Sequence, residues 1–242
     1  MSDFVEKLIK VADENEATKG IINKQRAEVL EKLSSHMLEV NEHLNLTAIK
    51  DEDGVILKHL VDSSACVPYI PENARIADIG CGGGFPSLVI AILRGDVSVL
   101  GVDSVSKKVK YVGETAEYLG LSNVSVSNRR AEELGQDENH RERYDIVTAR
   151  AVARLNVLCE LCIPLLKIGG KFIAMKSQTT EEELGEAKNA IALVGGKVKS
   201  VNRYTLTDGT EMLERTIVVI EKVEKTPKKY PRNNSQIAKK PL

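Results

Sequence analysis

Tryptophan is absent from this 242-residue chain, and phenylalanine (three), cysteine (four) and proline (seven) are scarce. Four cysteines do not make a disulfide framework in a chain of this length, so we expect reduced thiols and a cytoplasmic protein. Apolar residues nowhere form a run of the roughly 18 residues that a membrane span needs. The N-terminus has no basic region followed by an apolar one. The sequence therefore predicts a protein that is neither exported nor bound to a membrane.

Neither sign of charge dominates, but the charge is unevenly distributed. The formal net charge is −1, whereas residues 222–242 carry seven Lys/Arg against one acid, a net charge of +6. Such a segment has two interpretations. It is either a solvated, disordered tail or a contact to nucleic acid in which Tyr230 stacks on a base.

Apolar periodicity divides the chain into a helical beginning and an α/β remainder. Residues 3 to about 44 keep a helical period, with a break near Gly20. From residue 74 on, short β-rich runs alternate with helical segments, which predicts βαβ units and a parallel sheet. We expect the last two strands to form a hairpin around Asp208-Gly209. The seven expected strands lie at 75–79, 98–103, 124–127, 144–149, 170–175, 197–205 and 214–221, and helices lie near 87–94, 106–119, 152–166 and 180–194.

The predicted fold class is α/β, with a Rossmann-like, seven-stranded, mostly parallel sheet and helices on both faces. Residues 1–70 are expected to be a helical extension packed on the catalytic domain, residues 71–223 that domain, and residues 224–242 a basic tail. Ligands of such sheets bind at the carboxyl ends of the strands. Polar residues at these ends are therefore the first candidates for a site.

The first predicted strand ends in a glycine-rich turn, Asp78-Ile79-Gly80-Cys81-Gly82-Gly83-Gly84-Phe85-Pro86. Glycines in such a turn let the backbone approach a cofactor closely. Counting the dinucleotide fingerprint G-x-G-x-x-G from Gly80 places Phe85 where a small residue must pack helix against strand, which argues against NAD and FAD. The spacing of Asp78, Gly80 and Gly82 resembles instead the first motif of the S-adenosylmethionine (SAM) methyltransferases, whose glycines border the methionine part of SAM.

Acidic residues follow the second and third predicted strands. Asp103 is suited to accept hydrogen bonds from two ribose hydroxyls, although it could also cap the helix that begins near Ser106. Glu132 follows the third strand, where the adenine ring would lie. Together with Glu133 it could equally form the acidic first turn of a short helix.

Cations follow the fourth and fifth predicted strands. Arg150 ends the fourth strand, Arg154 lies one helical turn later, and Lys176 ends the fifth. Surface ion pairs are the commoner fate of such residues, but three cations around one cleft suit a phosphate-bearing substrate. Ahead of the first strand, Asp62 is a candidate to accept hydrogen bonds from the amino and imino edge of guanine. Asp62, Arg150 and Lys176 are thus candidate substrate-positioning residues of a catalytic site.

Other reactive residue types are expected to carry no chemistry. His59 is expected to be a packed helix residue without a proton-transfer role. Cys159 and Cys162 have C-x-x-C spacing, but no second pair and no nearby His completes a zinc site, so two buried thiols and no metal are expected. The chain also lacks an N-P-P-[YFW] segment for amino-group methylation and a Pro-Cys dipeptide for carbon-5 methylation. Guanine N7 needs neither, because its lone pair carries no proton to remove.

Blocks along the chain resemble, in order, those of the bacterial 16S rRNA guanine-N7 methyltransferases, the RsmG or glucose-inhibited division protein B (GidB) family. The resemblance spans about residue 45 to the C-terminus. Its most specific parts are the first block and the Gly-Phe-Pro end of the glycine turn. The blocks are Asn45-Leu46-Thr47-Ala48-Ile49, His59-Leu60-Val61-Asp62-Ser63, the glycine turn, Asp103-Ser104 with Lys107-Lys108, Ala149-Arg150-Ala151 and Tyr230-Pro231-Arg232.

The resemblance implies a class I SAM-dependent methyltransferase fold, SAM as cofactor and S-adenosyl-L-homocysteine (SAH) as product. It implies methyl transfer to N7 of a guanine in the decoding region of 16S rRNA, and we expect a monomer acting on the small ribosomal subunit or its assembly intermediate. The tail departs from the family pattern, with Ser235 where a glycine usually stands and Ile237 where a proline does. SAM contacts are implied at Gly80, Phe85, Ala131, Glu132 and Arg150, the motif and strand ends add Asp78, Gly82 and Asp103, and RNA is expected at Lys50, Lys58, Lys107, Lys108, Arg154, Lys229 and Arg232.

Two functions of other classes stay open at this point. A SAM methyltransferase for a small molecule would share the pocket but would not need the +6 tail. A non-catalytic RNA-binding protein with a vestigial fold would not bind SAM. An NAD-dependent oxidoreductase is disfavoured by Phe85.

Overall fold

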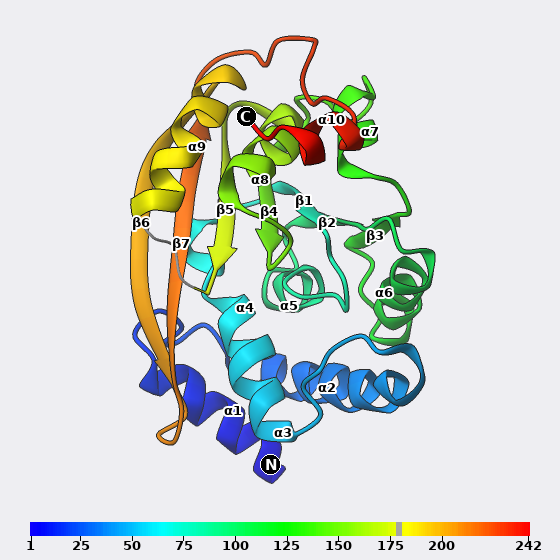
Figure 1. The fold of residues 1–242 in the computed structure, drawn as a ribbon. Helices are drawn as coiled ribbons and strands as arrows, with labels where there is room; N and C mark the ends of the chain where they lie inside the picture. The colour runs from blue at the N-terminus through cyan, green and yellow to red at the C-terminus, as the bar shows by residue number, and fades with distance from the viewer. Residues whose placement is uncertain (178–180) are drawn as a thin grey trace.

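A seven-stranded sheet runs through the computed structural model, which describes residues 1–177 and 181–242 (Figure 1). Its strands are β1 (Arg75–Ile79), β2 (Ser98–Val102), β3 (Val124–Ser127), β4 (Tyr144–Arg150), β5 (Leu166–Lys176), β6 (Gly196–Thr207) and β7 (Met212–Lys222). The order across the sheet is β3-β2-β1-β4-β5-β7-β6. β1 to β5 pair in parallel, and β7 lies antiparallel between β5 and β6. The predicted mostly parallel sheet and its final hairpin are therefore confirmed.

Helices cover both faces of the sheet, as predicted. They are α5 (Ser87–Leu93) and α6 (Ser106–Tyr118) on one face, and α7 (Ala131–Gln136), α8 (Leu155–Cys162) and α9 (Glu181–Leu193) on the other. Side chains of β1 alternate between the faces, because successive residues of a strand point to opposite sides. Ile76 packs with Ile90 of α5, whereas Ala77 packs with Leu158 of α8.

The largest deviation from the predicted boundaries lies between β4 and β5. The helix expected at 152–166 ends early at Cys162 and passes into a 3-10 turn, η3 (Ile163–Leu165). Pro164 has no N–H to continue an α-helical ladder, so the chain leaves the helix and enters β5 at Leu166 rather than at residue 170. The first residue of the helix expected at 180–194 lies outside the described residues.

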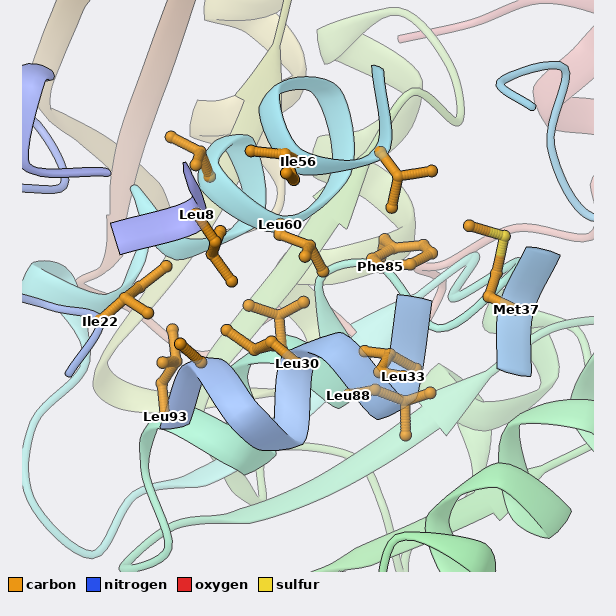
Figure 2. Packing of buried hydrophobic residues seen from close by; sticks show 14 of the residues in the cluster. Leu8, Ile22, Leu30, Leu33, Met37, Ile56, Leu60, Phe85, Leu88 and Leu93 are labelled. Carbon is orange, nitrogen blue, oxygen red and sulfur yellow. The ribbon is translucent and has the colours of Figure 1, made fainter. Parts of the chain in front are cut away.

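The N-terminal helices share a core with the sheet. They are α1 (Asp3–Glu14) and α2 (Lys24–Leu44), which begin where the side chains of Ser2 and Asn23 cap them. Leu30 and Leu33 of α2 lie in one buried cluster with Leu88 and Phe85 (Figure 2). The glycine turn after β1 is therefore held partly by residues from the first helices of the chain.

A short helical stretch links α2 to β1. It comprises α3 (Glu52–Val55), the π-helix η1 (Ile56–Val61), α4 (Asp62–Ser64) and the 3-10 turn η2 (Val67–Tyr69). π-helical turns are rare and occur frequently at functional sites. This one carries His59 and leads directly into Asp62, and both residues are buried beside β4.

The C-terminal segment, residues 226–242, is folded, so the first of its two interpretations, a disordered tail, is wrong. It contains α10 (Asn234–Lys239), which lies beside α7 and α8 (Figure 1). Tyr230 is only 5% exposed, which rules out the predicted stacking of its ring on a base in this conformation. The guanidinium of Arg141 explains much of this order, because it donates to the carbonyls of Thr226, Pro227 and Tyr230.

Candidate functional site

The glycine turn is held by backbone bonds and by Asp103. The amides of Gly80 and Cys81 both donate to the carbonyl of Val102, at 2.8 and 3.0 Å. Gly80 has φ +74°, a conformation that L side chains rarely adopt, and a Cβ there would lie 2.5 Å from the side chain of Val152. The Asp103 carboxylate accepts hydrogen bonds from the amides of Gly82 (3.1 Å) and Val105 (2.8 Å).

Asp78 does not line this turn, in contrast to its predicted role as a cofactor contact. It is fully buried, and its carboxylate accepts hydrogen bonds from the hydroxyls of Ser87 and Thr148, the latter at 2.8 Å. Burial raises the pKa of this carboxyl, and the two hydroxyls oppose that shift. Asp78 therefore ties β1 to α5 and β4 beneath the site.

Two adjoining cavities open at the carboxyl ends of the strands. The glycine-loop cavity, of about 360 Å³, is lined by Gly80, Gly82, Phe85, Asp103 and Arg150 among others. The β3-side cavity, of about 220 Å³, is lined by Ala131, Glu132 and again Gly80 and Asp103. The structure thus brings together every predicted cofactor residue except Asp78.

His59 contributes a neutral, fixed ring to the glycine-loop cavity. Its ring stacks on Phe85 with centroids 4.5 Å apart and an interplanar angle of 9°. Burial, together with the charge of Arg150, lowers the pKa of His59 to about 3. Because the guanidinium of Arg150 can only donate, Nδ1 accepts its bond at 3.2 Å, and Nε2–H donates to Thr47 Oγ1 at 2.8 Å. His59 is packed, as expected from the sequence.

A third cavity, the β5-side cavity of about 360 Å³, shares His59, Arg150 and Ala151 with the glycine-loop cavity. Asp62 lies in its wall and binds two arginines, Arg150 at 3.0 Å and Arg215 at 2.9 Å. We expected the carboxylate to be available to guanine. Each of its oxygens accepts a hydrogen bond from one guanidinium, so a guanine would share this carboxylate with both arginines.

Sequence reasoning missed two residues of the β5-side cavity, Tyr204 and Arg215. They come from β6 and β7, the hairpin that was correctly predicted. The register of β7 against β5 places Thr216 opposite Lys176, so the beginning of β7 reaches the carboxyl end of β5. That antiparallel register, which the sequence does not specify by itself, brings Arg215 to the site.

Most of the predicted substrate-binding cations have acidic partners. Lys176 pairs with Glu183 at 2.6 Å, Lys58 with Glu211 at 2.8 Å, and Arg154 with Glu186 at 2.6 Å. Arg232 has a structural role, because its guanidinium binds Glu160, whose side chain is fully buried, at 2.6 Å. Of the remaining predicted RNA contacts, Lys50 and Lys107 are exposed, Lys108 lines the glycine-loop cavity, and the Lys229 ammonium lies 5.1 Å from the centre of the Tyr230 ring.

Two further expectations concern metals and thiols. All four cysteines are buried and unpaired, as expected for Cys159 and Cys162. Within residues 1–177 and 181–242, no group of three or more His, Cys, Asp or Glu side chains could hold a metal ion.

In the same part of the chain, no helix is long and apolar enough to cross a membrane.

Sequence comparison relates the chain to proteins of one family. A family model described as rRNA small subunit methyltransferase G matches residues 26–213. A protein named ribosomal RNA small subunit methyltransferase G from Lactobacillus delbrueckii subsp. bulgaricus is 47% identical over 210 residues, covering 85% of this chain and 87% of the relative. A protein of the same name from Staphylococcus carnosus is 45% identical over 241 residues, covering 98% of both.

Solved structures share the fold at low sequence identity. The YcgJ protein from Bacillus subtilis matches with a TM-score of 0.54 and 15% identity, covering 69% of this chain and all of that one. A SAM-dependent O-methyltransferase from Thermotoga maritima matches with a TM-score of 0.51 and 17% identity, covering 79% and 72%. These likenesses, with the strand order, confirm the predicted class I methyltransferase fold.

Proposed function

The chain belongs to the rRNA small subunit methyltransferase G family, and from that premise we propose that it transfers a methyl group from SAM to N7 of a guanine in 16S rRNA. The observation that carries the proposal is the junction of the glycine-loop and β5-side cavities at His59 and Arg150. A methyl donor in one cavity and a base in the other would meet there. Family membership favours rRNA over the small-molecule substrate that the sequence left open.

The residues present fit SAM. Gly82 leaves the backbone open beside the glycine-loop cavity, where the methionine part would lie, and Gly80 lines the same cavity. The Asp103 carboxylate stands between the two cofactor cavities, in position for ribose hydroxyls. Ala131 and Glu132 border the β3-side cavity, which would take the adenine. When bound, SAM supplies an electrophilic methyl group on its sulfonium sulfur.

The protein's own residues position the base rather than remove a proton. Guanine N7 has a free lone pair at neutral pH, so alignment and exclusion of water matter more than a general base. His59 fits that requirement because its lowered pKa, about 3, keeps it neutral. Asp62 fixes Arg150 and Arg215 in the wall of the β5-side cavity, where two guanidinium groups share one carboxylate and suit an RNA phosphate.

The proposal is tested by methyl transfer from labelled SAM to three substrates prepared from a strain without the enzyme: naked 16S rRNA, an assembly intermediate and the mature small subunit. We expect the labelled methyl group to be incorporated into at least one of these substrates, and we expect it in the 16S rRNA of that substrate. Label in none of the three substrates, while a whole-cell extract incubated in parallel shows a labelled protein or small molecule, would refute it.

A further inference from the structure

The C-terminal segment forms part of the wall of the β3-side cavity. Asn234, the first residue of α10, lines this cavity together with Ala131, Glu132 and Asp103. Asn234 lies far from these residues in the sequence, and nothing in the glycine turn or the strand ends predicted its presence. The basic segment that the sequence assigned to RNA therefore reaches the cofactor side of the molecule.

A buried ion pair holds the segment in this place. Glu160 of α8 is fully buried, and burying a carboxylate is costly unless it is paired. Its Oε1 accepts from the Arg232 backbone amide (2.9 Å) and Nε (2.8 Å), and its Oε2 accepts from NH2 (2.6 Å). The same guanidinium donates to the carbonyl of Lys240 at 3.0 Å. Arg232 thus joins the beginning and end of α10 to α8.

The carboxamides around the start of α10 differ in their use. Asn233 and Gln236 form a reciprocal capping box, in which each side chain accepts a hydrogen bond from the backbone of the other. In the part of the chain that the structure describes, the Asn234 carboxamide is exposed and has no hydrogen bond. Among the described residues, Asn234 is therefore the one of the three that lines the β3-side cavity and whose carboxamide oxygen is not used in the cap.

The chemistry of a carboxamide suits adenine. An Asn side chain can accept a hydrogen bond from the exocyclic amino group and donate one to a ring nitrogen, the pairing by which Asn recognises adenine in nucleic acids. Glu132, on the same cavity, cannot supply the donor because an ionised carboxylate only accepts. We propose that Asn234 is a cofactor-binding residue that recognises the adenine amino group, and that the Glu160–Arg232 pair positions it. This inference rests on the proposed SAM site.

The test uses the full-length protein and calorimetric titration with two ligands, SAH and its analogue lacking the 6-amino group. The variants are Asn234→Ala, Arg232→Lys and, as matched control, Ser235→Ala, whose hydroxyl donates to the Asn233 side chain. Asn234→Ala should weaken SAH binding about three- to tenfold and weaken binding of the deamino analogue by a smaller factor, because the analogue has no amino group whose hydrogen bond Asn234 could accept. Arg232→Lys should reduce the preference for SAH over the deamino analogue, while circular dichroism shows that the protein is folded. Ser235→Ala should change the affinity for neither ligand.

Three results would count against the inference in different ways. Wild-type protein that binds no SAH would overturn the proposed cofactor site itself. Wild-type protein that binds SAH with the same affinity as Asn234→Ala would overturn only the role of Asn234. An equal loss for SAH and the deamino analogue would also overturn it, because the contact would not involve the amino group.

Discussion

At the scale of single residues, Arg150 connects the two halves of the site. Its guanidinium donates to the Lys58 carbonyl at 2.8 Å, to Asp62 at 3.0 Å and to His59 at 3.2 Å, and lies 5.7 Å from the centre of the Phe85 ring. The sequence correctly placed Arg150 at a strand end in the cleft. It could not show that Asp62 would pair with this arginine, because the pairing depends on the π-helix packing beside β4.

Replacing Asp62 by Asn tests that arrangement. Asp62→Asn leaves Arg150 and Arg215 without their shared carboxylate, and losing one partner of a buried ion pair costs about 3 kcal/mol of folding stability. Urea unfolding measures this cost. The control Asp53→Asn breaks an exposed pair with Lys7 and should change stability by less than about 0.5 kcal/mol. For Asp62→Asn we also expect the rate of methyl transfer to fall by a larger factor than the affinity for SAM. Unchanged turnover would show that the two arginines need no anchor.

The neutral His59 predicts a particular pH dependence of stability. The folded pKa, about 3, lies below the ordinary 6.5, so the unfolded chain binds the proton first as the pH falls. Stability from this group is therefore complete above pH 6.5 and is lost progressively between pH 6.5 and about 3. Relative to His59→Gln, the wild type should lose about 2 kcal/mol between pH 7.5 and pH 5. The exposed His43→Gln should follow the wild-type curve. Parallel curves for wild type and His59→Gln would contradict the lowered pKa, because His59 would then bind its proton at the same pH in the folded and the unfolded chain.

At the scale of elements, the strands could be predicted from the sequence, whereas the packing of the C-terminal segment could not. Hydrophobic alternation between turn signals placed β1, β2 and β3 within one residue of their positions, because short buried strands carry a clear pattern. For the C-terminal segment, the sequence left a solvated tail and a nucleic-acid contact open, and neither interpretation foresaw that the segment docks on the protein. Its order depends on Glu160 and Arg141, which lie about 70 to 90 residues away in the chain and whose contacts no local pattern reveals.

The ion pair of that segment can be tested by stability alone. Arg232→Ala leaves Glu160 buried without a cation, which should cost about 3 to 5 kcal/mol. Lys229→Ala removes a charge of the same sign from an exposed position nearby and should change stability by less than about 0.5 kcal/mol. Denaturant unfolding of both variants provides the comparison. Equal stabilities would indicate that the segment is not docked on α8.

At the scale of the whole molecule, the N-terminal helices and the sheet share one buried cluster that includes Phe85 of the glycine turn (Figure 2). Under the proposed function, exposed cations are the groups expected to contact the phosphates of a large RNA. Lys107 is exposed and Lys108 lines the glycine-loop cavity beside it. A residue that neutralises one phosphate changes the salt dependence of binding by about one unit of slope.

The salt dependence of small-subunit binding separates surface cations from structural ones. Lys107→Ala should reduce the slope of log affinity against log salt by about one. Lys10→Ala, exposed on α1 and paired with Glu14, should not alter the slope. Titrations at several salt concentrations measure both. An unchanged slope for Lys107→Ala would remove this residue from the RNA-binding surface.

The position of the transferred methyl group tests the central claim most directly. Small subunits from a strain without the enzyme are incubated with the purified protein and SAM, and their 16S rRNA is treated with borohydride and aniline, which cleave the chain at 7-methylguanosine. The account predicts enzyme-dependent cleavage at one guanine in the decoding region. Methyl incorporation without such cleavage, or cleavage outside 16S rRNA, would contradict it.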